Sequence, residues 1–251
     1  MKDDALGSED RRRLEELASG LEAAFGQDLL SVVLYGSAAR SDHFGQGSSD
    51  LNVAVILKDI SLASLERGTA ASRGWSQAGN RPLFFLSPEW IEGSRDVFPI
   101  EFFDIIDSHR VIRGSDPFAG LTVSLENLRL QCESELKMKL IHLRTGYMEM
   151  HEDSGMLARL LAASYASVIA VFRGVLRAAR RSVPAQGEEV VREIAALSGI
   201  ETAPFSEVAA IKKGGPGAAS VAVKPLFKRY YEQIETLARS VDAGFDKGAT
   251  R

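Results

Sequence analysis

A glycine–serine pair and an arginine directly follow the apolar run from Leu29 to Tyr35. Gly36 and Ser37 interrupt the run, and Arg40 comes three residues after Ser37. Glycine lets backbone N–H groups approach a phosphate closely, a serine hydroxyl adds a donor, and an arginine can neutralise charge. We therefore expect Gly36, Ser37 and Arg40 to bind phosphate groups.

Two polar residues stand at the start of the next apolar run. Asp50 and Asn52 are two apart, so on a strand their side chains point to the same side, opposite to Leu51 and Val53. Oxygen ligands of this kind suit Mg²⁺ or Mn²⁺, which bind one or two carboxylates together with substrate phosphates. Two such ions can hold the attacking and leaving oxygens of a phosphoryl or nucleotidyl transfer. A turn-facing amide at Asn52 is the alternative interpretation.

A third acid is available further along the chain, in the segment IEFFDII. Its apolar composition predicts a strand over residues 100–106. Glu101 and Asp104 are three apart and cannot share one side of a regular strand, so only one of them can join Asp50. The position in the strand favours Glu101, and Asp104 is the alternative.

The elements that position these residues alternate between helix and strand up to about residue 118. We expect a helix over residues 8–25, another over 61–79, and strands over 29–35, 50–57, 82–87 and 100–106, with a short fifth strand near 110–114. Helical periodicity dominates from there on. The sequence thus predicts two domains, residues 1–118 and 119–251.

The bulk composition is that of a soluble globular protein. Of the 251 residues, 45% are hydrophobic and 25% charged, and the formal net charge of −4 argues against a nucleic-acid partner. Cys132 is the single cysteine, which excludes an internal disulfide and fits a reducing compartment. We see neither a signal peptide nor an uninterrupted apolar stretch that would span a membrane, and we expect a cytoplasmic protein.

The segment LYGSAAR…SSDLNVAVIL resembles the DNA polymerase beta-like nucleotidyltransferase superfamily, with the minimal nucleotidyltransferases and kanamycin nucleotidyltransferase-like proteins as the nearest likeness. The resemblance implies an α+β fold, in which a nucleotidyltransferase-like mixed sheet flanked by helices is followed by an all-helical bundle domain. The residues that match the pattern of this superfamily are Gly36, Ser37, Arg40, Asp50 and Glu101.

This resemblance implies an enzyme that moves a nucleoside monophosphate from a nucleoside triphosphate, such as ATP, to a hydroxyl of a small molecule or protein. Asp50, Asn52 and Glu101 would be catalytic and would hold Mg²⁺ or Mn²⁺, while Gly36, Ser37 and Arg40 would bind the nucleotide. Relatives of this architecture are commonly homodimers. The general base stays open among the acids of the helical part: Glu133, Glu135 and Glu149.

The sequence departs from the superfamily at Asn52, where a second catalytic acid is expected. An amide brings no charge, so its presence should weaken metal binding and stabilisation of the transition state. The alternative hypothesis is a catalytically impaired binding or regulatory protein. A third hypothesis rests on Arg144 and His151, whose spacing is similar to the ribonuclease motif of HEPN helical domains.

Overall fold

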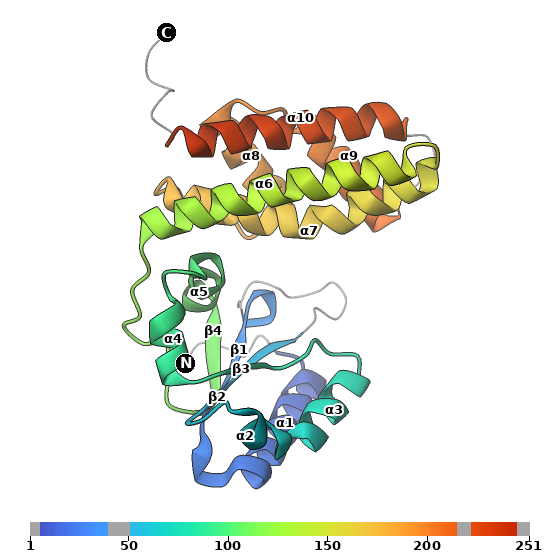
Figure 1. The fold of residues 1–251 in the computed structure, drawn as a ribbon. Coiled ribbons are helices and arrows are strands. Elements are labelled where there is room, and N and C mark those ends of the chain that lie inside the picture. The colour runs from blue at the N-terminus through green and yellow to red at the C-terminus, as the bar shows by residue number, and fades with distance from the viewer. Residues whose placement is uncertain (1–5, 40–50, 215–221, 245–251) are drawn as a thin grey trace. The chain divides into compact units, whose positions relative to one another are not determined.

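The computed structural model describes residues 6–39, 51–214 and 222–244. The chain divides into two compact units: Met1–Asp96 with Glu101–Val123, and Val97–Ile100 with Ser124–Arg251. The first unit holds a sheet flanked by helices and the second is helical (Figure 1). The predicted α+β class with a mixed sheet and a following helical bundle is confirmed.

The sheet has four strands in the order β3-β2-β1-β4. The central strand β1 (Leu29–Tyr35) pairs antiparallel with β2 (Asn52–Leu57) and with β4 (His109–Gly114), while β3 (Phe84–Leu86) runs parallel to β2. The end of β1 therefore lies at the same edge of the sheet as the beginnings of β2, β3 and β4.

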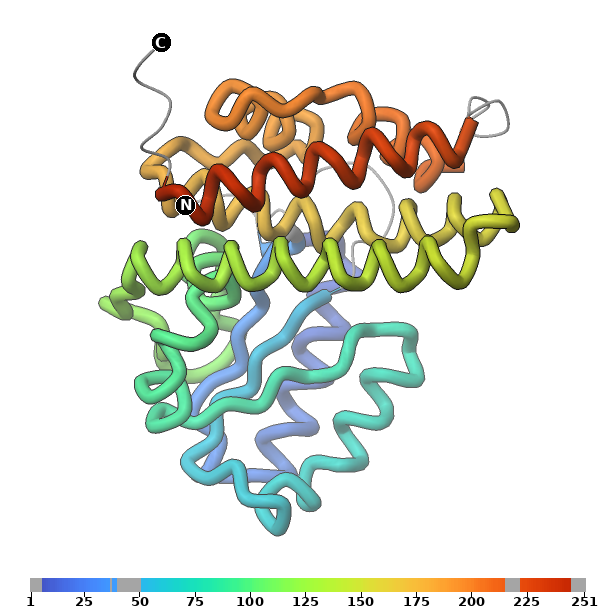
Figure 2. The backbone as a smooth tube through the Cα atoms, turned by 45° about the horizontal axis from the view of Figure 1, so that its top comes forward, coloured from blue at the N-terminus to red at the C-terminus, as the bar shows by residue number. Residues whose placement is uncertain are grey.

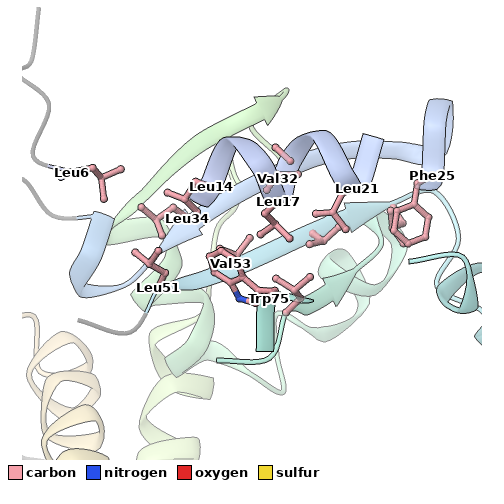
Figure 3. Packing of buried hydrophobic residues seen from close by; sticks show 14 residues of the cluster. Leu6, Leu14, Leu17, Leu21, Phe25, Val32, Leu34, Leu51, Val53 and Trp75 are labelled. Atoms are coloured by element: carbon pink, nitrogen blue, oxygen red, sulfur yellow. The ribbon is translucent and has the colours of Figure 1, made fainter. Parts of the chain in front are cut away.

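Helices α1 (Ser8–Phe25) and α3 (Thr69–Gln77) cover one face of the sheet. Alternate residues of the strands point into this layer, as expected for side chains that change sides along a strand. Figure 3 shows the resulting apolar cluster, whose labelled members are Leu6, Leu14, Leu17, Leu21, Phe25, Val32, Leu34, Leu51, Val53 and Trp75.

The opposite face of the sheet is covered by α4 (Pro88–Ser94) and α5 (Pro99–Asp107). Ile91 of α4 and Phe102 and Ile105 of α5 are buried here. They pack with strand residues that point to this side, including Val33 and Ile56. Tyr35 also belongs to this layer, so side chains at the end of β1 on this face lie near α5.

The strand predicted over residues 100–106 is wrong, because this segment forms helix α5. Its fully buried residues, Phe102 and Ile105, are three apart, which is helical spacing and not the alternation of a strand. Pro99 fits the first position of a helix, where a missing N–H costs nothing. The fourth strand of the sheet is the short segment predicted near residues 110–114, observed as His109–Gly114.

The helix predicted over residues 61–79 is divided into α2 (Leu62–Glu66) and α3. The division falls at Gly68, where a Cβ atom would lie 2.4 Å from the Phe25 ring. Only glycine allows this close approach to α1. Two single turns of 3₁₀ helix, η1 (Gly26–Asp28) and η2 (Ser37–Ala39), stand before and after β1.

The helical unit consists of α6 (Leu125–Met150), α7 (Ser154–Ala178), α8 (Gly187–Ser198), α9 (Ala203–Lys213) and α10 (Val223–Asp242). Figure 2 shows α6 and α10 running beside each other within this unit. Its aromatic centre joins three elements: the Phe205 ring centroid lies 5.2 Å from that of Phe172 and 5.1 Å from that of Tyr230. All three side chains are fully buried.

Helix α9 was not predicted from the sequence, although Phe205 and Val208 bury completely at helical spacing. Among the described residues, one helix, α7, is long and apolar enough to cross a membrane by length and composition alone. The core helix of a folded bundle meets the same criteria. Ten of the 25 residues of α7 are buried within the structure.

Candidate functional site

Two of the predicted site residues that the structure describes, Gly36 and Asn52, lie together at one edge of the sheet. Tyr35 ends β1, and its partner across the antiparallel ladder is Asn52, the first residue of β2. On the other side Tyr35 pairs with His109, which begins β4. We call this end of the sheet, formed by Tyr35, Gly36 and Asn52 with the segment leading into β3, the turn edge.

Gly36 makes the turn that leaves β1. Its φ is +78°, in the left-handed region that favours glycine. Its N–H donates to the carbonyl of Ser108 at 2.9 Å, which ties the turn to the junction between α5 and β4. The N–H of Ala39 donates back to the Gly36 carbonyl at 3.1 Å and closes η2. The sequence prediction of a tight glycine turn after the first strand is therefore confirmed.

The Asn52 side chain lies against this turn. A Cβ atom placed on Gly36 would be 3.0 Å from Nδ2 of Asn52, a tight contact. The amide thus faces the same space as the turn, and it offers both hydrogen-bond donors and an acceptor there. A carboxylate at this position would offer acceptors alone, so the amide suits an anion better than an aspartate would.

Three charged groups act on the Tyr35 hydroxyl. Burial is the largest influence and raises the pKa of Tyr35 above its ordinary value, the positive charge of Arg81 lowers it, and the carboxylates of Glu101 and Asp104 raise it again. The turn edge therefore has a guanidinium from the segment before β3 and two carboxylates from α5 within electrostatic reach.

Glu101 and Asp104 occupy different positions from those predicted. Both lie on α5, and residues three apart on a helix lie on the same side. Glu101 is exposed and Asp104 partly buried. The expectation of a third acid on a strand is therefore wrong, and the strand alternation that allowed only one of the two to face the site does not apply. The described strand beside β2, Phe84–Leu86, carries no carboxylate.

His109 is held by structural contacts. Its Nδ1 donates to the carbonyl of Ile105 at 2.9 Å, and its Nε2 lies 3.1 Å from both carboxylate oxygens of Asp116. Burial raises the pKa of Asp116, but hydrogen bonds from the Phe118 N–H and from His109 outweigh it, and the pKa ends below its ordinary value. These contacts fix the start of β4 and leave the imidazole engaged on both nitrogens.

Three predicted site features lie outside the part of the chain that the structure describes: Arg40, Asp50 and the side chain of Ser37. The backbone of Ser37 begins η2 directly after the glycine turn. Because η2 is a single turn, the contribution of a helix dipole to any anion binding here is expected to be small.

The acids considered as a general base lie on α6. Glu133 pairs with Lys137, which lowers the pKa of the carboxyl despite some burial, and also with Arg129 at 3.2 Å. Glu135 pairs with Lys139 at 3.1 Å. Ion pairs four residues apart are ordinary features of a helix surface, and they give these two acids a structural explanation.

The two residues of the ribonuclease hypothesis are engaged separately. Arg144 donates from Nε to the Tyr231 hydroxyl, and its Nη2 lies 3.5 Å from Glu235. His151 lies 2.8 Å from Glu152. Each side chain thus has its own partners on the surface of the helical unit, and no contact between Arg144 and His151 supports a shared active site among the described residues.

The structure describes only part of the metal-ligand set predicted from the sequence. Within residues 6–39, 51–214 and 222–244, no three His, Cys, Asp or Glu side chains form a group that could hold one. At the turn edge, Asn52 is neutral and Arg81 places a positive charge near Tyr35. A permanent cation disfavours a second cation beside it. The expectation that Asp50, Asn52 and Glu101 hold Mg²⁺ or Mn²⁺ stays a prediction, because Asp50 lies outside the described residues.

Arg81 is the residue of the turn edge that the sequence analysis missed. It stands directly before Pro82, at the start of a segment correctly predicted as a strand. The only sign of this in the sequence is that Arg81 immediately precedes a predicted strand. To place Arg81 at the turn edge, one must also know that β3 runs parallel to β2, and the direction of pairing cannot be predicted for so short a strand.

The fold resembles a known structure. The crystal structure of spectinomycin adenyltransferase AAD(9) from Enterococcus faecialis with ATP and spectinomycin matches with a TM-score of 0.53 and 9% sequence identity, over 89% of this chain and 98% of that chain. The sequence matches no protein-family model and no curated protein. The match shows that this chain has the nucleotidyltransferase-like fold with a helical C-terminal region.

Proposed function

We propose that this protein binds a nucleoside triphosphate at the turn edge and that its capacity for nucleotidyl transfer is impaired. The observation that carries the proposal is the Asn52 amide against the Gly36 turn, 3.0 Å from the place of a glycine Cβ. In the fold that this chain shares with an adenyltransferase solved with ATP, that arrangement retains hydrogen-bond donors for phosphate oxygens. The Asn52 amide lacks the negative charge that an acid at this position would bring to a metal ion.

Two further features support binding over transfer. The strand beside β2 carries no acid, and the acids Glu101 and Asp104 come from a helix. Transfer with two metal ions needs carboxylates that clamp both ions during the displacement. The neutral Asn52 in place of an acid weakens such a clamp, so we place this protein among nucleotide sensors or regulatory proteins.

Calorimetric titration with ATP, GTP, CTP and UTP tests the binding step. We expect at least one triphosphate to bind, and Asn52→Ala to weaken that binding about tenfold, the loss of roughly one hydrogen bond to a charged group. Gln27→Ala is the matched control, because Gln27 is an exposed amide near the other end of β1. Absence of binding by every triphosphate would refute the proposal.

The second candidate is a working nucleotidyltransferase that acts on a hydroxyl of a small molecule. It is favoured by the coverage of the match to AAD(9), which extends over the sheet unit and the helical unit alike. Incubation with α-³²P-labelled triphosphates, Mg²⁺ or Mn²⁺ and a panel of hydroxyl-bearing metabolites separates the candidates. We expect no labelled product from the natural protein and measurable product from Asn52→Asp. Product from the natural protein would favour the transferase.

A further inference from the structure

Helix α5 begins in one unit and ends in the other. Its first two residues, Pro99 and Ile100, belong to the helical unit, whereas residues 101–107 belong to the sheet unit. The later part of the helix is fixed beneath the sheet by the buried side chains of Phe102 and Ile105. The two parts of α5 are therefore held by different cores.

The side chain of Ile100 is buried against α6 and α7. A Cβ atom placed on Gly174 of α7 would lie 3.3 Å from Cγ1 of Ile100 and 2.7 Å from Sγ of Cys132, which belongs to α6. The same Cβ atom would lie 3.6 Å from Cδ1 of Leu128, also on α6. Because a closely packed interior has no room for an extra carbon here, glycine at position 174 gives Ile100 its place beside Cys132.

A hydrogen bond from α6 completes this attachment. The Ile100 N–H donates to Oε1 of Gln131 at 2.7 Å. The first N–H groups of a helix have no partner within the helix, and the Ile100 N–H is one of them. Gln131 therefore caps the start of α5 from another helix, at the same place where the Ile100 side chain packs beside Gly174.

We propose that Gln131 and Gly174 form a docking site for the first turn of α5, and that this docking keeps the rest of α5 ordered in the sheet unit. The order of α5 then depends on how α6 packs against α7. Without docking, the Ile100 N–H loses its partner and the Ile100 side chain meets water, so the helix frays from this end. Glu101, the acid predicted from the sequence to bind a metal ion, directly follows Ile100 and lies in the part that frays. This docking is independent of the proposed nucleotide binding.

Hydrogen–deuterium exchange of the full chain, measured by mass spectrometry of its peptides, tests this proposal. In Gln131→Leu, the amides of residues 103–107 should exchange about tenfold faster than in the natural protein, because the start of α5 has lost one hydrogen bond. Gln131→Glu keeps an acceptor for the Ile100 N–H, and its α5 amides should exchange within about twofold of the natural rate. Natural exchange rates in Gln131→Leu would overturn the proposal.

Gln233→Leu is the matched control. Gln233 of α10 accepts from the Glu201 N–H at 2.9 Å, which is the same kind of bond within the helical unit but involves no residue of α5. Its removal should leave the exchange of residues 103–107 unchanged. Equal acceleration in Gln131→Leu and Gln233→Leu would show that α5 responds only to the overall stability of the helical unit, and it would overturn the proposal.

A pair of glycines between α6 and α7 gives a second measurement. Gly174→Ala presses on Ile100 and Cys132, whereas the Cβ of Gly146→Ala would lie 2.5 Å from Cδ2 of Leu160 and does not touch α5. Compared at equal exchange rates of α10, the α5 amides should exchange about tenfold faster in Gly174→Ala than in Gly146→Ala. Equal α5 rates in the two variants would contradict the docking. If circular dichroism shows that Gly174→Ala does not fold, the variants of Gln131 decide.

Discussion

The helical unit and the sheet unit use their polar residues differently. Along α6, Glu133 pairs with Lys137 and Glu135 with Lys139, in each case one helical turn apart. At the turn edge, Asn52 comes from one segment and Arg81 from another, and neither position is required by a local rule of helix or strand. The difference teaches that local pairing accounts for much of the polar surface of the helical unit, whereas the turn edge needs a functional explanation.

The variant with the largest expected effect tests the core of the helical unit. Phe205 is fully buried between Phe172 and Tyr230. We expect Phe205→Ala to lower the free energy of unfolding by about 3–5 kcal/mol, from lost apolar burial and the cavity left behind. Chemical denaturation followed by circular dichroism measures the change.

Met148→Ala is the control for this variant. Met148 lies on α6 with 74% of its surface exposed, so its truncation should change the free energy of unfolding by less than about 0.5 kcal/mol. Equal losses for both variants would contradict the packing described for the helical unit.

The second test measures how the free energy of unfolding depends on pH through a residue of the same core. Burial raises the pKa of Tyr230, partly opposed by its hydrogen bond with Ser164. A phenol that holds its proton more tightly in the folded state contributes stability that is fully present below the unfolded pKa of about 10 and is lost as pH rises above it. Between pH 10 and 11.5, the natural protein should lose up to about 1.4 kcal/mol per pH unit more than Tyr230→Phe.

Urea denaturation at a series of pH values measures this difference in slope. Tyr231→Phe serves as the neighbouring control, because the Tyr231 hydroxyl contacts Arg144 and lies outside the core. Identical slopes for the natural protein and Tyr230→Phe would show that the Tyr230 hydroxyl is accessible to water.

The third test moves to the turn edge, with two glycines compared. Both Gly36 and Gly26 have positive φ, but a Cβ would meet Asn52 at Gly36 and nothing within 4 Å at Gly26. Alanine at either position should cost about 1 kcal/mol of backbone strain. Only Gly36→Ala should also weaken triphosphate binding, by about tenfold, since it displaces the amide. Equal affinities in the two variants would place the nucleotide elsewhere.

The smallest expected effect concerns the anchor of Arg81. Trp75→Phe removes the indole N–H that donates to the Arg81 carbonyl and should cost about 1 kcal/mol of stability. Chemical denaturation followed by circular dichroism measures the change. Trp90→Phe, on the face covered by α5, keeps this hydrogen bond and is the control.

Much of the sheet unit was predictable because its signals are local. The glycine turn after an apolar run and the strands over 29–35 and 82–87 follow from composition and spacing. The structure has a turn at Gly36, a strand over Leu29–Tyr35 and, within the second range, a shorter strand over Phe84–Leu86. Asn52 was singled out by its spacing from Asp50. The prediction succeeded where a few consecutive residues determine the backbone.

The predictions failed where contacts between residues far apart in the sequence determine the structure. IEFFDII is apolar enough for a strand or a helix, and packing of Phe102 and Ile105 under the sheet selects the helix. Glu101, predicted on a strand, therefore lies on this helix, on the same side as Asp104. Arg81 escaped notice because its place near the turn edge depends on the parallel pairing of β3, which is a property of the assembled sheet.

Helix α7 has a consequence for synthesis of the chain. Its apolar residues pack against α6, which precedes it, and against α8, α9 and α10, which follow it. A ribosome therefore releases this long apolar helix before most of the helices that cover it have been translated. Until α10 has been synthesised, the apolar surface of α7 is exposed to chaperones and membranes. Translational pauses after residue 178 would lengthen that exposure.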